Sequence, residues 1–375
     1  MNRTGTLAAL LAAVCSLSIG AGPVSRPSLP RAVEGKAAPK EEPRYLGKPT
    51  SYWIKKLAEG GPSHRKQAVE ALTAIGPDGE KVAPALIRAL DDDEADVRIG
   101  VLVALRAMGP KARPAIPALV LAVRDRNVDF RTKALQALGS TRSTDKEVVA
   151  ALIERITNEE VASIRFTALA VLESAGPTAV KVALPVLVRM SKSPISVNAF
   201  ERDGRPAVLR ALAVAGSDAV PHLTPLLEDR LMQWEAAGSL QAIGPAAKAA
   251  IPALVGGLKK GAKPSDNLLA LTGALAAIGK EAVPALIDAL LHERAGDWAS
   301  LALAKIGPPA LPALRKALQG RNAIRRQKAA STLGQMGRAA ATAIPDLRKA
   351  LADPNPDVCE AAAAALKAIA QAPPK

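Results

Sequence analysis

Residues that could support acid–base or metal chemistry are few and scattered along this chain. Its three histidines, His64, His222 and His292, lie far apart, and none has the neighbouring Cys or His spacing of a zinc site. An isolated histidine on a helical scaffold is more often a surface or packed residue than a ligand. We therefore predict no metal site.

The densest carboxylate cluster is the run "LDDDEADVR", in which Asp91 to Asp96 fall in a turn and at a helix start. Such a cluster could hold calcium or act in acid–base catalysis, but its position favours helix capping in a solvated loop. The sequence contains no nucleophile elbow, phosphate-binding loop, dinucleotide fingerprint or zinc-protease motif. We predict no catalytic residue, no cofactor and no enzyme activity.

The helices that carry these residues repeat in a common register. Ten leucines serve as anchors, and the spacing between consecutive anchors ranges from 28 to 40 residues. Apolar residues recur four residues before and three residues after the anchor, which places them on one face of an α-helix. The anchors are Leu72, Leu105, Leu138, Leu172, Leu212, Leu240, Leu275, Leu303, Leu333 and Leu366.

A joint follows each anchored helix. Glycine stands four residues after the anchor in eight of ten units, the exceptions being Arg142 and Ala370, and it suits a helix C-terminus. A second proline, such as Pro84 in "PALIRAL", leads the other helix of the unit. This second proline lies 8 residues after the joint glycine in some units, such as Gly76 to Pro84, and 5 residues after it in others, such as Gly279 to Pro284. The difference of three residues is close to one helical turn. Prolines that directly follow the glycine and bar helix continuation are Pro77, Pro110, Pro177, Pro245 and Pro308.

Arginine occupies the position seven residues before the anchor in six of ten units. We call it the ladder position and expect each arginine to reach a carboxylate in its own turn or in the next unit. An aspartate two residues earlier is predicted to cap the helix in five units: Asp96, Asp129, Asp203, Asp266 and Asp357. The ladder arginines are Arg65, Arg98, Arg131, Arg165, Arg205 and Arg326, and the departures are Gln233, Leu268, Gly296 and Cys359.

The Asp-x-Arg helix start, the Ala-rich helix with its anchor leucine and the Gly-Pro joint resemble HEAT repeats, particularly the short bacterial type also seen in phycobilin lyase subunits. The opening "YLGKPTSYWIKKL", with Trp53 packing the first helix, is similar to the lead-in of exported bacterial HEAT-repeat proteins. The resemblance spans residues 48–371. It implies an all-α fold, an armadillo-like α-solenoid of about ten stacked antiparallel helix pairs with a concave binding surface.

Two tryptophans, Trp234 and Trp298, stand at the starts of second helices in units that lack the ladder arginine. One interpretation is that each indole fills space near the missing arginine. The other is an aromatic contact on the concave face. A longer connection, Ser191 to Arg205, is either a further place for contacts or a tolerant loop.

Basic residues are concentrated near the C-terminus. Residues 315–349 hold nine basic residues against one acidic residue, Asp346, within a chain of net charge +15. Such a surface attracts an anionic partner, the alternative being an ordinary solvated end of the stack. The residues predicted to bind an anionic partner are Arg321, Arg325, Arg326, Lys328, Arg338, Arg348 and Lys349.

The N-terminus has the pattern of a secretory signal peptide. Arg3 precedes an uncharged apolar run from Leu7 to Ile19, so residues 1–21 are predicted to be the signal and residues 22–47 a flexible Pro/Ala-rich lead-in. Val14 before Cys15 argues against a lipid anchor, because a small residue is usual there. We expect no other membrane span, and localisation in the periplasm or at the cell surface. After cleavage only Cys359 remains, and we interpret it as a small half-buried hydrophobe.

These patterns predict a non-enzymatic scaffold that presents a solenoid groove to a protein partner, whose identity the sequence does not give. The alternative is binding of nucleic acid or another anionic polymer through the C-terminal basic repeats, with a steep salt dependence.

Overall fold

The computed structural model describes residues 42–76, 81–192, 199–261 and 268–371, with side chains from residue 204 onward in the third range. The predicted signal peptide, Cys15, Pro77 and Asp266 lie outside these residues, as do residues 193–198 of the long connection. The described chain begins with a small antiparallel hairpin, β1 (Arg44–Tyr45) and β2 (Lys48–Pro49); β1 lies inside the predicted lead-in and β2 directly after it. Trp53 is buried against it, and its Nε1 donates to the Tyr45 carbonyl over 3.3 Å.

Helices then alternate between two rows, which we call A helices and B helices. The A helices are α1 (Thr50–Glu59), α3 (Val82–Arg88), α5 (Ile116–Ala122), α7 (Lys146–Asn158), α9 (Pro177–Lys192), α11 (Val220–Leu223), α13 (Ile251–Lys260), α15 (Val283–Ala289), α17 (Leu311–Leu318) and α19 (Ile344–Ala350). The B helices are α2 (Pro62–Ile75), α4 (Ala95–Met108), α6 (Val128–Ser140), α8 (Ala162–Ala175), α10 (Ala199–Val214), α12 (Gln233–Ile243), α14 (Leu268–Ile278), α16 (Gly296–Ile306), α18 (Ala323–Gln335) and α20 (Pro356–Gln371).

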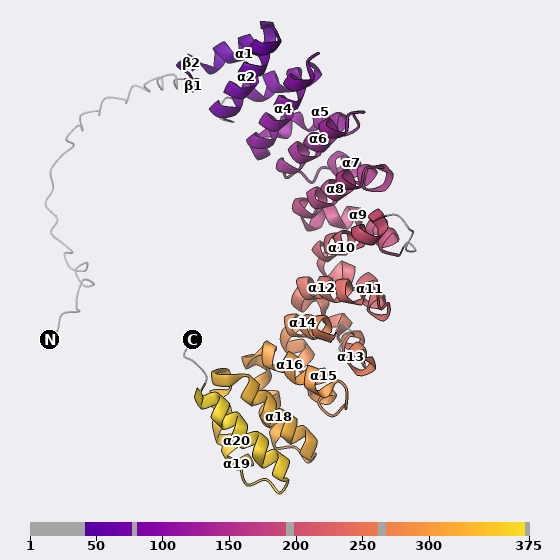
Figure 1. Cartoon of the computed structure of the whole chain (residues 1–375), viewed down its shortest axis with the longest axis vertical. Coiled ribbons are helices and arrows are strands. Elements are labelled where there is room, and N and C mark those ends of the chain that lie inside the picture. The colour runs from indigo at the N-terminus through magenta and orange to yellow at the C-terminus, as the bar shows by residue number, and fades with distance from the viewer. Residues whose placement is uncertain (1–41, 77–80, 193–198, 262–267, 372–375) are drawn as a thin grey trace, which may run out of the picture. The chain divides into compact units, whose positions relative to one another are not determined.

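Each A helix contacts the B helix that follows it, and each B helix contacts the next B helix along the chain (Figure 1). The anchor leucines lie between these rows and are buried, except that Leu366 of the last unit is half-buried. One helix pair cannot cover its own apolar stripe, so stacking makes a continuous core of small and branched side chains. The predicted all-α solenoid of stacked helix pairs is confirmed.

The joints are short 3-10 helices. The long joints hold seven residues: η2 (Gly109–Ala115), η5 (Gly244–Ala250) and η8 (Gly337–Ala343). The short joints are η3 (Gly216–Ala219), η6 (Gly279–Ala282) and η7 (Pro308–Ala310), and two further 3-10 helices, η1 (Ala89–Asp91) and η4 (Thr224–Glu228), end A helices. A 3-10 helix has three residues per turn. One turn of 3-10 helix is therefore the unit that a joint gains or loses.

All eight predicted joint glycines have positive φ, between 57° and 90°. This left-handed conformation ends the B helix and turns the chain toward the next A helix. In the unit where arginine replaces the glycine, Arg142 adopts the same conformation with φ of 50°. The position therefore dictates the backbone, and glycine is the residue that adopts it with least strain.

The predicted aspartate caps are wrong by two or more residues where they are described. Asp96, Asp129 and Asp357 lie inside the first turn of α4, α6 and α20. The capping side chains belong to asparagines instead: Asn127 accepts from the Phe130 amide over 3.0 Å, and Asn322 from the Arg325 amide over 3.1 Å. The first-turn aspartates remain stabilising there, since they face the positive end of the helix dipole.

One segment is more apolar than expected. Leu268–Ala289, which covers α14, η6 and α15, has 22 residues and a mean hydropathy of 1.4, and among the described helices it alone is long and apolar enough to cross a membrane. The expectation that no stretch beyond the N-terminus has this composition was therefore wrong. Half of this stretch is buried inside the structure, where α14 contacts α12 and α16. Its composition follows from its place in the core of the stack.

Candidate functional site

Three of the six ladder arginines, Arg65, Arg131 and Arg326, form ion pairs with a carboxylate of the next unit. Arg131 donates through Nη2 and Nε to the two carboxylate oxygens of Glu159, over 2.8 and 3.1 Å. Arg326 forms the same paired contact with Asp353, with both distances 2.7 Å, and Arg65 contacts Asp92. Each acceptor lies 27 or 28 residues further on, in the turn before the next B helix. Of the two predicted alternatives, the next unit supplies the carboxylate.

These contacts shift the titration of the carboxylates. The Arg326 guanidinium is the main cause that lowers the pKa of Asp353 below its usual range. Burial raises the pKa of Glu159, but the Arg131 guanidinium and the Val161 amide outweigh burial and lower it overall. Both carboxylates are therefore charged at neutral pH and serve the stack as fixed acceptors.

The ladder side chain also donates a hydrogen bond to a backbone carbonyl at the C-terminal end of the preceding A helix. Arg98 donates to the carbonyl six residues before it, Asp92, over 2.6 Å, and Arg131 and Arg326 make the equivalent bonds over 2.8 and 3.0 Å. Two of the substitutes keep this bond: Gln233 donates to Leu227 over 2.9 Å, and the Cys359 thiol donates to Asp353 over 3.1 Å. The carbonyls at a helix C-terminus lack internal partners, and this donor satisfies one of them in these five units.

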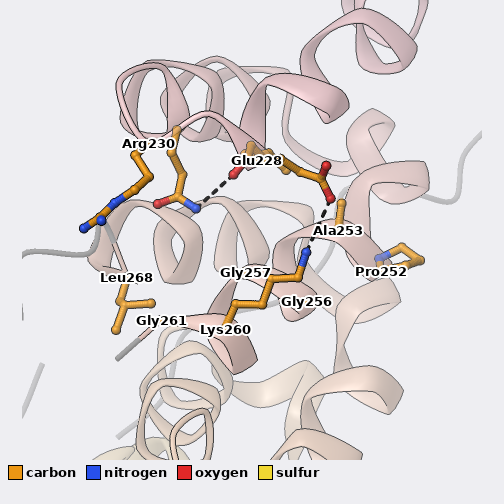
Figure 2. Close-up of a pocket in the computed structure, with 11 residues that line it drawn as sticks. Glu228, Arg230, Pro252, Ala253, Gly256, Gly257, Lys260, Gly261 and Leu268 are labelled. Carbon is orange, nitrogen blue, oxygen red and sulfur yellow. Dashed lines mark hydrogen bonds and ion pairs between the residues drawn. The ribbon is translucent and has the colours of Figure 1, made fainter. Parts of the chain in front are cut away.

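Where Gln233 replaces arginine, a hollow opens on the turn side of the stack. Gln233 keeps the carbonyl bond, but the acceptor position 27 residues on is Lys260, so the interhelix ion pair is lost. The hollow has a volume of about 840 Å³, against about 430 Å³ for the one at Arg65. Gly256 and Gly257 of α13 form one side of it, and Lys260 reaches across to Glu228 over 3.4 Å (Figure 2).

A second, larger hollow crosses four successive B helices, α10 to α16, and shares Leu268 with the first. We call it the groove; its volume is about 980 Å³. A smaller hollow of about 580 Å³ continues from Trp298 toward Gln335 on α18. The residues that line the groove include Pro206, Arg210, Trp234, Glu235, Gly238, Gln241, Ala242, Leu269, Gly273, Trp298 and Lys305.

The repeat register explains the shape of the groove. Two residues before the anchor, the outward position holds Gly238 on α12 and Gly273 on α14, which form the floor; the space above Gly238 is open, and the Gln241 side chain lies over Gly273. Four residues earlier on the same helices stand Trp234 and Leu269, which form one wall. Glycine costs about 1 kcal/mol relative to alanine in a helix interior. Packing does not call for it at Gly238, where an added Cβ would meet no atom within 4 Å.

The two tryptophans are brought together along this groove. Trp234 is 62% exposed, so the interpretation that its indole fills the space of the missing arginine is wrong. That space is the hollow of Figure 2, and Trp234 does not line it. Trp298 is half-buried and lines both the groove and its continuation. A contact of either indole with a partner stays a prediction.

Charged groups stand at the two ends of the groove. Arg210 on α10 is 66% exposed, and its nearest carboxylate is Glu173 at 4.0 Å. Burial raises the pKa of the Glu173 carboxyl, and Arg210 offsets only part of that effect. Lys305 on α16 is exposed at the other end. Between them lies Glu235, whose buried Oε2 has no hydrogen-bond partner.

The C-terminal basic residues are not gathered into one free surface. Arg326 is 13% exposed and held by Asp353, and its binding of an anionic partner stays a prediction. Arg325 contacts Asp288 over 3.6 Å, and Lys328 contacts Asp297. The remaining members of the predicted set lie on different elements: Arg321 on the α17–α18 turn, Arg338 in η8, and Arg348 and Lys349 in the last turn of α19. There, cations stabilise a helix C-terminus.

Metal and thiol chemistry find little support in the structure. Among the described residues, no three His, Cys, Asp or Glu side chains lie close enough to hold a metal ion. Cys359 is a half-buried free cysteine, in agreement with its interpretation as a small packed residue. The acidic run serves the ladder, since Asp92 accepts from Arg65 and from the Glu94 amide.

The sequence interpretation missed the glycine floor and Leu269. The signal was available, because Gly238 and Gly273 occupy the same outward position in two consecutive units and are each preceded, four residues earlier, by a large apolar residue. A search for recurring positions does not detect it, because these glycines recur in only two units. The outward face varies from unit to unit and shows no period.

Comparison with known proteins supports the repeat assignment. A family model described as HEAT repeats matches residues 50–139 and 311–374. The groove lies between these two regions. A search of curated proteins found no match.

Solved structures of similar fold include an engineered protein, with 19% identity over 86% of this chain and 99% of that chain and a TM-score of 0.43. Another is the karyopherin Kap121p bound to the extreme C-terminus of the protein phosphatase Cdc14p, with 16% identity, a TM-score of 0.45, and coverage of 85% of this chain. Kap121p bound to Pho4p gives 15% identity and a TM-score of 0.44. This chain spans 41% and 42% of the length of those two karyopherin chains. The register of anchors and joints agrees with this match, and HEAT repeats are shown over residues 50–139 and 311–374.

Proposed function

We propose that this chain is an exported, non-enzymatic scaffold that binds a protein partner in the groove across α10 to α16. The observation that carries the proposal is the exposure of two large apolar side chains, Trp234 at 62% and Leu269 at 60%, around the glycine floor of the groove. Contiguous exposed apolar surface of this kind marks interaction sites. A concave, mostly apolar site with a few polar groups is typical of ligand recognition.

Export is supported by the apolar run from Leu7 to Ile19 after Arg3. It is tested by expressing the full chain and sequencing the N-terminus of the product recovered outside the cytoplasm. The proposal expects a new N-terminus close to residue 21. A product that keeps Met1 and stays in the cytoplasm would overturn export without touching the binding proposal.

Partner binding is tested by site-specific photo-crosslinking in the native envelope. A photoreactive phenylalanine derivative replaces Leu269 in the groove and, as the matched control, Leu121 of α5, which is 67% exposed and lies outside the groove. We expect a discrete protein adduct from position 269 and none from position 121. Equal adduct patterns from both positions, or nucleic acid as the only material captured, would refute the proposal.

A further inference from the structure

We propose that the groove recognises one extended protein segment that is apolar at its centre and carries carboxylates at both ends. This inference rests on the proposed function and names the chemistry of the partner. It follows from three properties of the groove: its width, its floor and the charges at its ends.

The width of the groove favours an extended segment over a helix. Trp234 and Ala242 mark its two sides on α12 and are eight residues apart, which is about 12 Å along a helix axis. The indole occupies part of that width. A helix with its side chains is about 10–12 Å across and does not fit in the remainder, whereas a single extended chain does.

The floor allows the main chain of the ligand to come close. A Cβ at Gly238 would meet no atom within 4 Å, so the space above it is open. A Cβ at Gly273 would lie 2.6 Å from Oε1 of Gln241, so the Gln241 amide lies over the floor. An amide side chain offers both a donor and an acceptor to a peptide backbone.

The cations at the two ends of the groove favour a bound segment with acidic ends. Arg210 and Lys305 are exposed cations at the α10 and α16 ends, while α14 between them contributes no charged residue to the lining. The nearby carboxylates are Glu235 of the lining, Glu173, which is 4.0 Å from Arg210, and Asp297, which Lys328 holds. Complementary charge in the partner is therefore acidic at both ends, and an apolar centre faces Trp234 and Leu269.

The spacing of the carboxylates follows from the stack. Three steps between neighbouring helices separate α10 from α16, and packed helices lie about 8–10 Å apart, which gives roughly 24–30 Å. An extended chain rises about 3.3 Å per residue. The two acidic ends are therefore expected roughly seven to nine residues apart.

The test uses two labelled peptides that differ only at their ends. Each has a centre of about eight residues, in which leucine alternates with serine so that one face of the extended chain is apolar. The acid-flanked peptide carries aspartates at both ends, and the control carries lysines. Binding to the full chain is measured by fluorescence anisotropy at low and high salt. We expect the acid-flanked peptide to bind about tenfold more tightly, with the preference lost at high salt.

Two variants locate the site. The double charge reversal Arg210→Glu with Lys305→Glu should invert the preference between the two peptides. Gly238→Leu should weaken both peptides by filling the floor, and Gly256→Leu is the matched control, because its Cβ also meets no atom within 4 Å but lies in the hollow of Figure 2. Circular dichroism checks that each variant is folded.

Equal affinity for the two peptides, a preference that survives the double reversal, or no binding of either peptide would overturn this inference. The proposed function is judged separately by the crosslink from position 269. An adduct there together with failure of the peptides would mean that the groove binds a protein of different chemistry.

Discussion

A single backbone position shows how strongly the repeat constrains individual residues. Eight units end the B helix with a glycine of positive φ, and the third unit places Arg142 in the same conformation with φ of 50°. A side chain with a Cβ is strained there by about 1–2 kcal/mol because the Cβ approaches the following carbonyl oxygen. The Arg142 side chain is exposed, so packing does not explain its presence.

Replacement of this residue by glycine should stabilise the protein. Arg142→Gly removes the strain but adds freedom to the unfolded chain, so we expect a net gain of about 1 kcal/mol in the free energy of unfolding. Thermal and urea unfolding followed by circular dichroism measure it. Arg142→Ala is the control: it keeps the Cβ and should give no gain. An equal gain from alanine would attribute the effect to loss of the arginine side chain instead.

At the scale of helices, the ladder links each B helix both to the A helix before it and to the turn after it. Arg326 donates to the Gly320 carbonyl over 3.0 Å and to both oxygens of Asp353 over 2.7 Å. Its side chain is 13% exposed and that of Asp353 is 10% exposed. Loss of one partner leaves a nearly buried group unpaired, which costs more than the bond contributed.

We therefore expect Arg326→Ala to lower the free energy of unfolding by about 1–2 kcal/mol. Arg326→Gln should lose less, because Gln233 shows that an amide still reaches the carbonyl six residues back. Thermal unfolding at neutral pH compares the two variants. The assignment of this carbonyl bond would be wrong if glutamine were as destabilising as alanine.

The same pair makes stability depend on pH. The Arg326 guanidinium lowers the pKa of Asp353 in the folded protein, so its contribution is present above the unfolded pKa, near 4, and is lost as pH falls through the folded value. We expect melting temperature to fall on acidification below about pH 4. The double variant Arg326→Gln with Asp353→Asn should show a shallower fall. An unchanged acid slope would mean that other carboxylates, such as Glu159, dominate it.

At the scale of the molecule, stability is expected to be distributed along the stack, because each unit contacts mainly its neighbours. Ala236 in α12 and Ala362 in α20 occupy the same register position, four residues before the anchor, and both are fully buried. The first lies in the middle of the stack and the second at the end. They differ in the number of neighbouring units that depend on them.

Ala362→Asp should unfold α20 and loosen α18 only, while Ala236→Asp should disrupt contacts on both sides of α12. A buried unpaired carboxylate costs several kcal/mol at either place. Hydrogen exchange read by mass spectrometry separates the outcomes: we expect lost protection confined to the end for Ala362→Asp, and spread from α10 to α14 for Ala236→Asp. Loss of protection throughout the chain in both variants would show that the stack unfolds as one cooperative unit.

The sequence by itself determined the repeat, its joints and the fold class, because anchor leucines, joint glycines and ladder arginines act through local and periodic contacts that a single register reveals. It also pointed to three departures from the repeat as places to look for function: the long connection from Ser191 to Arg205, the units of Trp234 and Trp298 that lack the ladder arginine, and the basic residues near Arg325. Cap positions were misplaced by a few residues, since asparagine and aspartate compete for the same turn and the sequence does not say which side chain the backbone meets.

Only the tertiary structure decided which surface forms where the repeat pattern changes. Stacking brings Gly238 beside Gly273 and aligns Trp234 with Leu269, although each pair is 35 residues apart in the sequence. It also showed that Arg326 forms an ion pair with Asp353, and that a hollow opens beside Gln233. The physical reason is that the outward face of a solenoid has no packing period. Its shape and charge come from neighbouring units brought side by side.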